Sequence, residues 1–364
     1  MLCVDLPKFR ILKKQGLSLR SMFGSHAPVA ALLAITAPMC FCTKEAQAQF
    51  RDLAIPGADG VTQAYSIQGS QVVGTYLDPF GMSHGFSYDL TTHMYGIYDA
   101  TLAVNGTIVT GLDGVNRAGS YFDASGTQHG FVFDGSSYNT IDLAAGVDGT
   151  EVTGISGKYV IGQTTDIFNP LFFGTPATSS FVMDLTTSAV TQVDAPDALA
   201  SANNTFLNAI SGNTAVGSYT GSDGIDHGVI YDIFTGQYTT VDDPLAAQGT
   251  VLYGIFGNDI VGTYVDSGGL SHGLVYDIAT GSFLTLDNPK GYSTIITGMA
   301  LSNNIFNPNP VFVGYYLAQN GNSTNTYGFW FQEAAPEPGT WAMFAGLATA
   351  AGAVRRRRKR SRAC

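Results

Sequence analysis

The sequence predicts an all-β protein, a six-bladed β-propeller, and three observations lead to this fold. A pattern of glycine, tyrosine, histidine and aromatic residues recurs along the chain, as is typical of a repeat protein. Each copy has the length of four short strands with their turns. The first and last copies are incomplete in opposite ways. A β-solenoid and a pair of β-sandwiches are the alternative folds for such a pattern.

The clearest copy of the repeat runs from Val261 to Ile278 and reads VGTYVDSGGLSHGLVYDI. The same pattern returns from Val73 onward, shifted by 188 residues without a gap. Six glycines mark the copies, which are about 48 residues long on average, and four copies keep the histidine. The glycines are Gly74, Gly119, Gly162, Gly217, Gly262 and Gly314, and the histidines are His84, His129, His227 and His272. The third and sixth copies lack the histidine and carry the insertions Phe168-Asn169-Pro170 and Phe306-Asn307-Pro308.

Strands are expected where apolar residues alternate with polar ones, and the segments between them carry the Asp, Gly, Asn and Pro of tight turns. In the fifth copy the expected strands are 259–265, 271–278, 283–287 and 294–299. The body has no long apolar stripe at the 3.6-residue period of a helix.

The two ends of the repeat region complement each other. Residues Phe50 to Ile67 match the second half of a repeat, whereas the last copy stops at Pro336 without its second half. We therefore expect the first strands to pair with the last and to close a ring, because closure removes exposed strand edges.

Composition narrows the range of partners. Positions 49 to 335 hold 25 acidic residues against four basic ones. The negative charge of this part of the chain repels the phosphate backbone of nucleic acid, so nucleic acid is not an expected partner. The four cysteines, Cys3, Cys40, Cys42 and Cys364, lie in the end segments, so no disulfide is expected in the body.

The first 48 residues read as a secretory signal peptide. Basic residues from Lys8 to Arg20 precede an apolar run from about Ala27 to Phe41, and Ala46-Gln47-Ala48 supplies the small residues of a cleavage site. We expect cleavage after Ala48 and export through the Sec machinery. The chain is thus divided into a leader (1–48), a repeat domain (49–335) and a C-terminal segment (336–364).

The C-terminal segment combines three signals. Pro336-Glu337-Pro338 is followed by an apolar stretch of 15 residues from Thr340 to Val354, which is short of the roughly 20 that span a bilayer as a helix. A basic cluster then follows: Arg355, Arg356, Arg357, Arg358, Lys359 and Arg360. The positive-inside rule holds such a cluster in the cytoplasm. We expect a transient transmembrane helix that leaves the body outside.

This ending resembles the PEP-CTERM sorting signal of Gram-negative bacteria, which Pro336, Glu337 and Pro338 match in order and position. The resemblance covers about the last 29 residues. It implies recognition by an exosortase, a membrane enzyme that removes the tail, and an association with exopolysaccharide and the cell surface.

The repeats in turn resemble the extracellular repeats named for His-Ala-Phe (HAF), with Gly85 and Gly130 in place of the alanine. This resemblance covers most of residues 64 to 332 and implies no activity that could be assigned to particular residues.

The repeated histidines and aspartates are the candidate chemical groups. Four histidines at equivalent places suggest a metal site, but each follows a glycine turn and precedes a strand, where it can bond across the hairpin. A structural role is therefore favoured. Turn aspartates such as Asp78, Asp123 and Asp266 are expected to cap turns, with calcium as the functional alternative. No cofactor is expected otherwise.

Enzyme motifs are missing from the body, which has no Gly-x-Ser-x-Gly, no phosphate loop and no His-Glu-x-x-His. A pair of carboxylates that cleaves a glycan would leave no local motif. The repeated tyrosines Tyr76, Tyr121, Tyr219 and Tyr264 are expected to pack within blades, with sugar stacking as the alternative.

The sequence therefore predicts a non-enzymatic, exported surface or matrix protein that is associated with exopolysaccharide and processed by an exosortase. A secreted carbohydrate-active enzyme, a glycosidase or polysaccharide lyase, is the alternative, and a ligand-binding module for exopolysaccharide is a third reading. The enzyme reading requires unlike residues from different blades in one pocket, and the third and sixth copies are where such divergence is expected.

Overall fold

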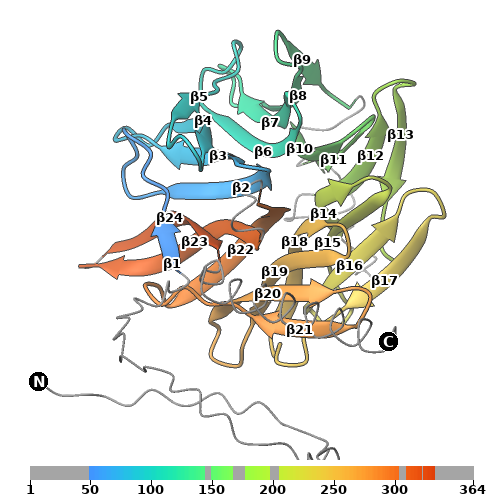
Figure 1. Cartoon of the computed structure of the whole chain (residues 1–364). Coiled ribbons are helices and arrows are strands. Elements are labelled where there is room, and N and C mark those ends of the chain that lie inside the picture. Colours follow the sequence, from blue (N-terminus) through green and yellow to red (C-terminus); the bar gives the residue numbers. More distant parts are fainter. Residues whose placement is uncertain are drawn as a thin grey trace, which may run out of the picture. The chain divides into compact units, whose positions relative to one another are not determined.

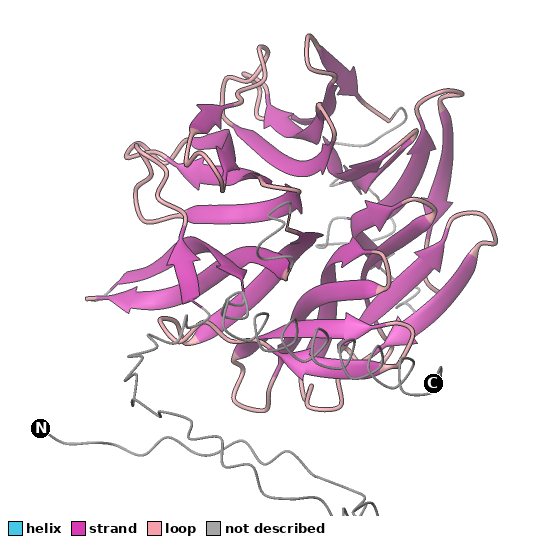
Figure 2. Ribbon diagram, viewed as in Figure 1, coloured by secondary structure: helices cyan, strands magenta, loops and turns pink. Residues whose placement is uncertain are grey.

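The computed structural model describes residues 49–143, 149–166, 177–196, 205–302, 309–321 and 323–332. These residues form 24 strands and contain no helix (Figure 2). In the part of the chain so described, no helix is long and apolar enough to cross a membrane. The predicted leader, the sorting segment with its transmembrane stretch, and both Phe-Asn-Pro insertions lie outside the described residues.

The described strands form six antiparallel blades of four strands each, arranged around a common centre (Figure 1). Blade 1 consists of β2 (Thr62–Gln68), β3 (Gln71–Leu77), β4 (Ser83–Asp89) and β5 (Tyr95–Ile97). Blade 2 consists of β6 (Thr107–Asp113), β7 (Asn116–Phe122), β8 (Gln128–Phe133) and β9 (Tyr138–Ile141). Blade 3 consists of β10 (Gly149–Ser156), β11 (Tyr159–Asp166), β12 (Ala177–Asp184) and β13 (Ala189–Val193).

Blade 4 consists of β14 (Thr205–Ser211), β15 (Thr214–Thr220), β16 (Asp226–Asp232) and β17 (Gln237–Val241). Blade 5 consists of β18 (Gly249–Phe256), β19 (Asp259–Val265), β20 (Ser271–Asp277) and β21 (Ser282–Thr285). Blade 6 consists of β22 (Ser293–Leu301), β23 (Pro310–Asn320), β24 (Ser323–Gln332) and β1 (Gln49–Asp52). The predicted six-bladed propeller is confirmed.

The predicted ring closure is confirmed as well. Strand β1 pairs antiparallel with β24, opposite residues 329–332, and so completes blade 6 from the other end of the chain. Phe50 packs on Phe329 and Phe331, with ring centroids 5.2 and 4.6 Å away. The structure also shows that a sequence copy and a blade do not have the same boundaries. The fourth strand expected in the fifth copy, 294–299, lies in β22, which is the innermost strand of blade 6.

Each innermost strand contacts the innermost strands of both neighbouring blades. Each also contains a β-bulge, in which one residue has no partner on the second strand of its blade. The six bulge residues, one from each blade in order, are Tyr65, Thr110, Thr153, Asn208, Tyr253 and Thr297. Four of them donate a side-chain hydrogen bond to a carbonyl of the next blade, as Thr297 Oγ1 does to Ala64 O at 2.7 Å between blades 6 and 1.

The six glycines that mark the repeat lie on the second strand of each blade, where the backbone passes closely behind the innermost strand. A Cβ atom placed on any of them would lie 1.8–2.1 Å from a carbonyl oxygen of that strand. At Gly217 the nearest atom would be Phe206 O, at 1.8 Å. A side chain at these positions is therefore excluded by backbone, which explains why glycine is repeated there.

Candidate functional site

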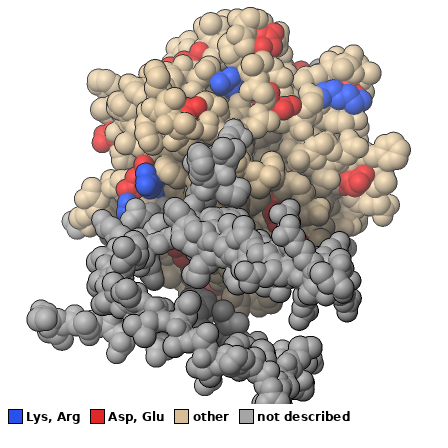
Figure 3. Space-filling view, viewed as in Figure 1, with Lys and Arg blue, Asp and Glu red and all other residues tan. Residues whose placement is uncertain are grey.

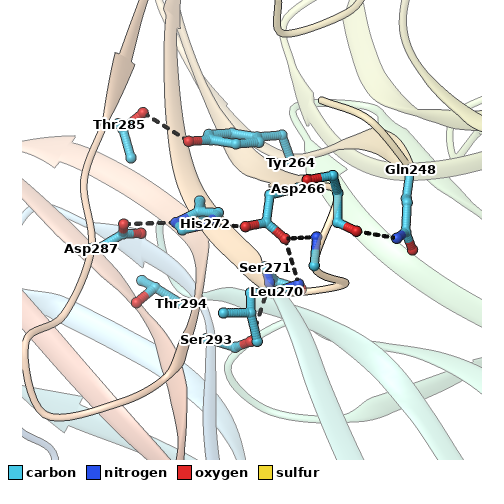
Figure 4. A network of polar contacts seen from close by, with 12 residues as sticks. Gln248, Tyr264, Asp266, Leu270, Ser271, His272, Thr285, Asp287, Ser293 and Thr294 are labelled. Carbon is cyan, nitrogen blue, oxygen red and sulfur yellow. Dashed lines mark hydrogen bonds and ion pairs between the residues drawn. The ribbon is translucent and has the colours of Figure 1, made fainter. Parts of the chain in front are cut away.

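The repeated histidines take part in a polar network at the turns of four blades, which we call the turn network. In blade 5, His272 Nδ1 lies 2.8 Å from Asp287 Oδ2, and Nε2 lies 3.4 Å from Asp266 Oδ2 (Figure 4). The imidazole stacks on Tyr264 with centroids 5.0 Å apart. The Tyr264 hydroxyl lies 3.2 Å from Thr285 Oγ1.

The same arrangement recurs in blades 1, 2 and 4. Each histidine has a turn aspartate on one side, an aspartate after the outermost strand on the other, and a buried tyrosine beneath it. The sets are His84 with Asp78, Asp99 and Tyr76, His129 with Asp123, Asp142 and Tyr121, and His227 with Asp223, Asp242 and Tyr219. The second aspartate, which follows the histidine by 13 to 15 residues, was not singled out from the sequence.

The turn aspartates use their oxygens within the turn. Asp266 Oδ1 accepts the backbone N–H groups of Gly268 and Leu270, while its other oxygen faces the histidine. Asp78 and Asp123 make equivalent contacts. This is the capping geometry expected of aspartate in a turn. Backbone hydrogen bonds are the largest cause that lowers the pKa of Asp78 and Asp266. For Asp123 the hydrogen bond from the Ser125 hydroxyl is the largest cause, and the pKa falls to about 2.

The pKa of each of the four histidines is raised above the ordinary 6.5. For His272 the hydrogen bond with Asp287 is the largest cause. For the other three, burial is the largest single influence and lowers the pKa, but the hydrogen bonds and charges of the two aspartates together outweigh it. The imidazolium form is therefore stabilised by folding.

These shifts predict a stability that falls as the solution becomes alkaline. Since the folded histidines hold their protons to higher pH than the unfolded ones, their contribution is complete below pH 6.5 and is lost as pH rises through the raised pKa. We expect the melting temperature to decrease between pH 6 and about pH 8 on a series of fluorimetric melts. A variant with all four histidines replaced by glutamine is the control, and its decrease over this range should be smaller. A melting temperature that rises over this range in the parent protein would contradict the assignment.

Among the described residues, no group of three or more His, Cys, Asp and Glu side chains is arranged to hold a metal ion. We expect the melting temperature of the purified protein to be the same with millimolar EDTA as without it. A decrease of several degrees that added calcium reverses would instead support the calcium alternative.

A second group of polar residues lies in the central channel, where sequence reasoning did not place a site. It consists of four residues that line a cavity, Tyr65 from blade 1, Glu151 and Gln163 from blade 3 and Tyr253 from blade 5, and of two residues that interact with Tyr65, Gln63 from blade 1 and Tyr315 from blade 6. We call this group the channel mouth. This cavity of about 120 Å³ is lined by Tyr65, Glu151, Gln163 and Tyr253 together with four other bulge residues. The Tyr65 hydroxyl donates a 2.8 Å hydrogen bond to Gln63 Oε1.

Two of these residues come from the divergent repeats. The residue after each marker glycine is a small, buried hydroxyl residue in four blades: Thr75, Ser120, Ser218 and Thr263. In blade 3 this residue is Gln163, which pairs with Glu151, and in blade 6 it is Tyr315, which pairs with Ile295. In blades 1 and 5 the hydroxyl of the small residue donates a hydrogen bond to a carbonyl of the next blade, Thr75 to Thr107 O and Thr263 to Thr294 O, both at 3.3 Å. In blade 3 the Ser180 hydroxyl makes the bond to the next blade, to Thr205 O at 2.6 Å. Position 163 therefore need not supply this bond and carries a long side chain.

Electrostatics couples the residues of the channel mouth. Burial raises the pKa of Glu151, although its side chain keeps some exposure to the channel. Burial also raises the pKa of Tyr65, Tyr253 and Tyr315. Tyr315 adds to the shift of both other tyrosines, and Glu151 adds to that of Tyr65, so these groups lie near one another across the channel. The site is therefore polar and aromatic.

Comparison with known proteins gives the fold. The structure is similar to TolB from Acinetobacter baumannii, with a TM-score of 0.50 and 14% identity over 74% of this chain and 65% of that one. The chain thus spans about two thirds of the TolB length. A fungal lectin from Aleuria aurantia with a six-bladed propeller matches with a TM-score of 0.44 and 10% identity, over 79% of this chain and 98% of that chain. No family model and no curated protein sequence matches the chain.

Proposed function

We propose that this protein is an exported component of the cell surface or extracellular matrix, in which the propeller has a structural or binding role alongside exopolysaccharide. The leader ending at Ala48 and the tail beginning at Pro336 support export and sorting by an exosortase, with the tail as a transient membrane anchor. The predicted cleavage after Ala48 leaves β1 intact at the start of the mature chain.

The observation that carries the structural part of this proposal is the turn network. Four blades repeat the same histidine, aspartates and tyrosine, and these side chains bond to one another and to the backbone of the turn. A catalytic site instead needs different residues in different roles. Repetition with internal hydrogen bonds is what a folding element requires.

The surface charge supports a partner other than nucleic acid. On the face shown in Figure 3 the described basic side chains form a few small patches beside acidic ones, with no continuous basic surface. Nucleic-acid binding depends on clusters of Lys and Arg that neutralise phosphates.

Cell fractionation tests the proposal. The propeller should be accessible to antibody on intact cells that produce the protein. Mass spectrometry of the protein released from them should find a mature N-terminus at Gln49 and no peptide from residues 355–360. An intact tail on protein recovered outside the cell, or a body confined to the cytoplasm, would overturn it.

A carbohydrate-active enzyme is the second candidate, and the channel mouth is the observation that favours it. Unlike residues from all six blades line one cavity, and burial raises the pKa of Glu151 as a general acid requires. Glycoside hydrolysis by the usual route needs two carboxyl groups. Among the described residues that line this cavity, Glu151 is the one carboxylate.

Light scattering separates the two candidates. The exopolysaccharide of the producing cells is incubated for hours with the purified protein, and its molar mass is followed. We expect the molar mass to stay constant, with co-elution of polymer and protein. A molar mass that falls with time, and that no longer falls with the Glu151→Gln variant, would replace the leading proposal with the enzyme.

A further inference from the structure

We propose that the channel mouth binds one uncharged sugar residue at the end of a polysaccharide chain. This inference rests on the proposed association with exopolysaccharide and identifies the site and the class of ligand. It is argued from the size of the cavity, the chemistry of its lining and the Glu151 carboxyl, which has no hydrogen-bond partner among the described residues.

The volume of the cavity limits the part of the ligand that can enter it. Its volume of about 120 Å³ is well below the roughly 300–1,000 Å³ of pockets that enclose drug-sized ligands. A second cavity of about 180 Å³ lies on the other side of the same bulge residues, so these residues separate the two spaces. A polymer threaded through the channel would have to displace them. The end of a chain needs only to enter the mouth.

The hydrogen bonds of the bulge residues keep this geometry in place. Thr110 Oγ1 donates to Val152 O at 2.7 Å, and Thr153 Oγ1 donates to Leu207 O at 2.6 Å. Asn208 Nδ2 donates to Leu252 O at 2.9 Å. Because each bond joins two blades, the side chains that separate the cavities are held by the ring itself.

The lining suits a sugar with hydroxyl groups and no charge. Tyr65 and Tyr253 line the cavity and offer aromatic rings to the apolar side of a sugar ring, and their hydroxyls can accept hydrogen bonds. Gln163, which also lines the cavity, offers an amide donor and acceptor for sugar hydroxyls. Tyr315 lies near both tyrosines and adds to the rise in their pKa. No Lys or Arg lines the described cavity, and Glu151 adds negative charge when ionised, so an anionic sugar is disfavoured.

Glu151 is the polar group that a ligand would satisfy. Within the described ranges its carboxyl group makes no hydrogen bond, whereas the four threonine and asparagine bulge residues around the channel are bonded to a neighbouring blade. The Glu151 carboxyl lines the cavity and is only partly exposed, and burial of a carboxyl group without a hydrogen-bond partner is costly. A sugar hydroxyl supplies such a partner, because it can donate a hydrogen bond to the carboxyl group.

Saturation-transfer NMR with the full chain tests the inference. The probes are the methyl α-glycosides of glucose, mannose and galactose, in which the methyl group stands for the rest of the chain, and glucuronate serves as the charged control. We expect transfer to at least one neutral glycoside and none to glucuronate. No transfer to any of the three neutral glycosides would overturn the inference, as would transfer to glucuronate of similar strength.

Variants drawn from the other blades test the location. In the Gln163→Ser and Tyr315→Thr double variant, each position carries the residue type found in equivalent blades, so the fold should be kept. We expect affinity for the bound glycoside to fall by at least about tenfold, with a melting temperature close to that of the parent. Glu151→Gln should also weaken binding, and Asp52→Asn, at the outer strand of blade 6, should not. Equal affinity in the parent and the double variant would place binding elsewhere and overturn the inference.

The two proposals fail in different ways. Protein found outside the cell without its tail, but silent toward all three glycosides, keeps the proposed function and rejects this site. A protein that binds a glycoside but is confined to the cytoplasm keeps this site and rejects the proposed function.

Discussion

Replacing Gly217 with alanine is expected to destabilise the propeller by roughly 3 kcal/mol or more, at the upper end of overpacking substitutions. The new Cβ would lie 1.8 Å from Phe206 O and 2.8 Å from the carbonyl carbon of the same residue. Both atoms belong to the backbone of β14, so no side-chain rotation can relieve the overlap. Either the pairing of β14 with β15 must open or the bulge at Asn208 must shift.

Thermal melting checks this prediction. A loss of 3 kcal/mol corresponds to a decrease of about 5 °C in a domain of this size. The control is Gly224→Ala, because Gly224 has open space around its Cβ position but a φ of +78°. That substitution should cost only about 1–2 kcal/mol, the usual penalty for an alanine in left-handed backbone. Equal decreases for the two variants would show that the close approach at Gly217 does not limit the fold.

The repeat could be recognised from the sequence, but the reason for its glycines could not. Their spacing identified six copies and therefore six blades. A repeated glycine can either adopt the positive φ of a turn or allow two strands to approach closely, and the sequence alone does not distinguish these two roles. Gly224 and Gly269 serve turns with positive φ, whereas Gly217 and Gly262 serve the close approach of two strands.

For the repeated histidines, the sequence predicted one of the two hydrogen-bond partners but not the other. Their place after a glycine turn predicted a bond across the hairpin, and His272 does contact Asp266 of that turn. The second partner, Asp287, lies beyond the outermost strand of the blade. Its place depends on how β21 returns along β20, which a local pattern does not specify.

The channel mouth was harder to predict because its residues are distant in the sequence and lie in different blades. Tyr65 and Tyr315 are 250 positions apart, and ring closure between blades 6 and 1 brings them together. The available signal was the replacement of a small hydroxyl residue after the marker glycine by Gln163 and Tyr315. The divergence of the third and sixth copies pointed to these repeats, but not to the side chains that face the channel.

Replacing Phe50 with alanine is expected to weaken the closure of the ring and to lower stability by about 2–3 kcal/mol. Phe50 is partly exposed, so the loss should lie at or below the lower end of the range for buried phenylalanines. Its ring packs on Phe329 and Phe331 of β24, and both of these are buried. No other strand replaces β1 at this edge of blade 6, because β1 is its outermost strand.

Asp52→Asn is the matched control, since Asp52 lies in the same strand. Its carboxylate is 2.7 Å from Lys290 Nζ and accepts a hydrogen bond from the Tyr316 hydroxyl at 3.2 Å. Exposed ion pairs contribute about 0–1 kcal/mol, and an asparagine keeps an acceptor for the tyrosine. Melting should therefore show a decrease of about 3–5 °C for Phe50→Ala and less than about 2 °C for Asp52→Asn. A Phe50→Ala protein that melts like the parent would mean that β1 does not hold the ring closed. Signal-peptide cleavage beyond residue 48 would then be harmless, whereas closure by β1 requires it to stop before the first residue of the strand.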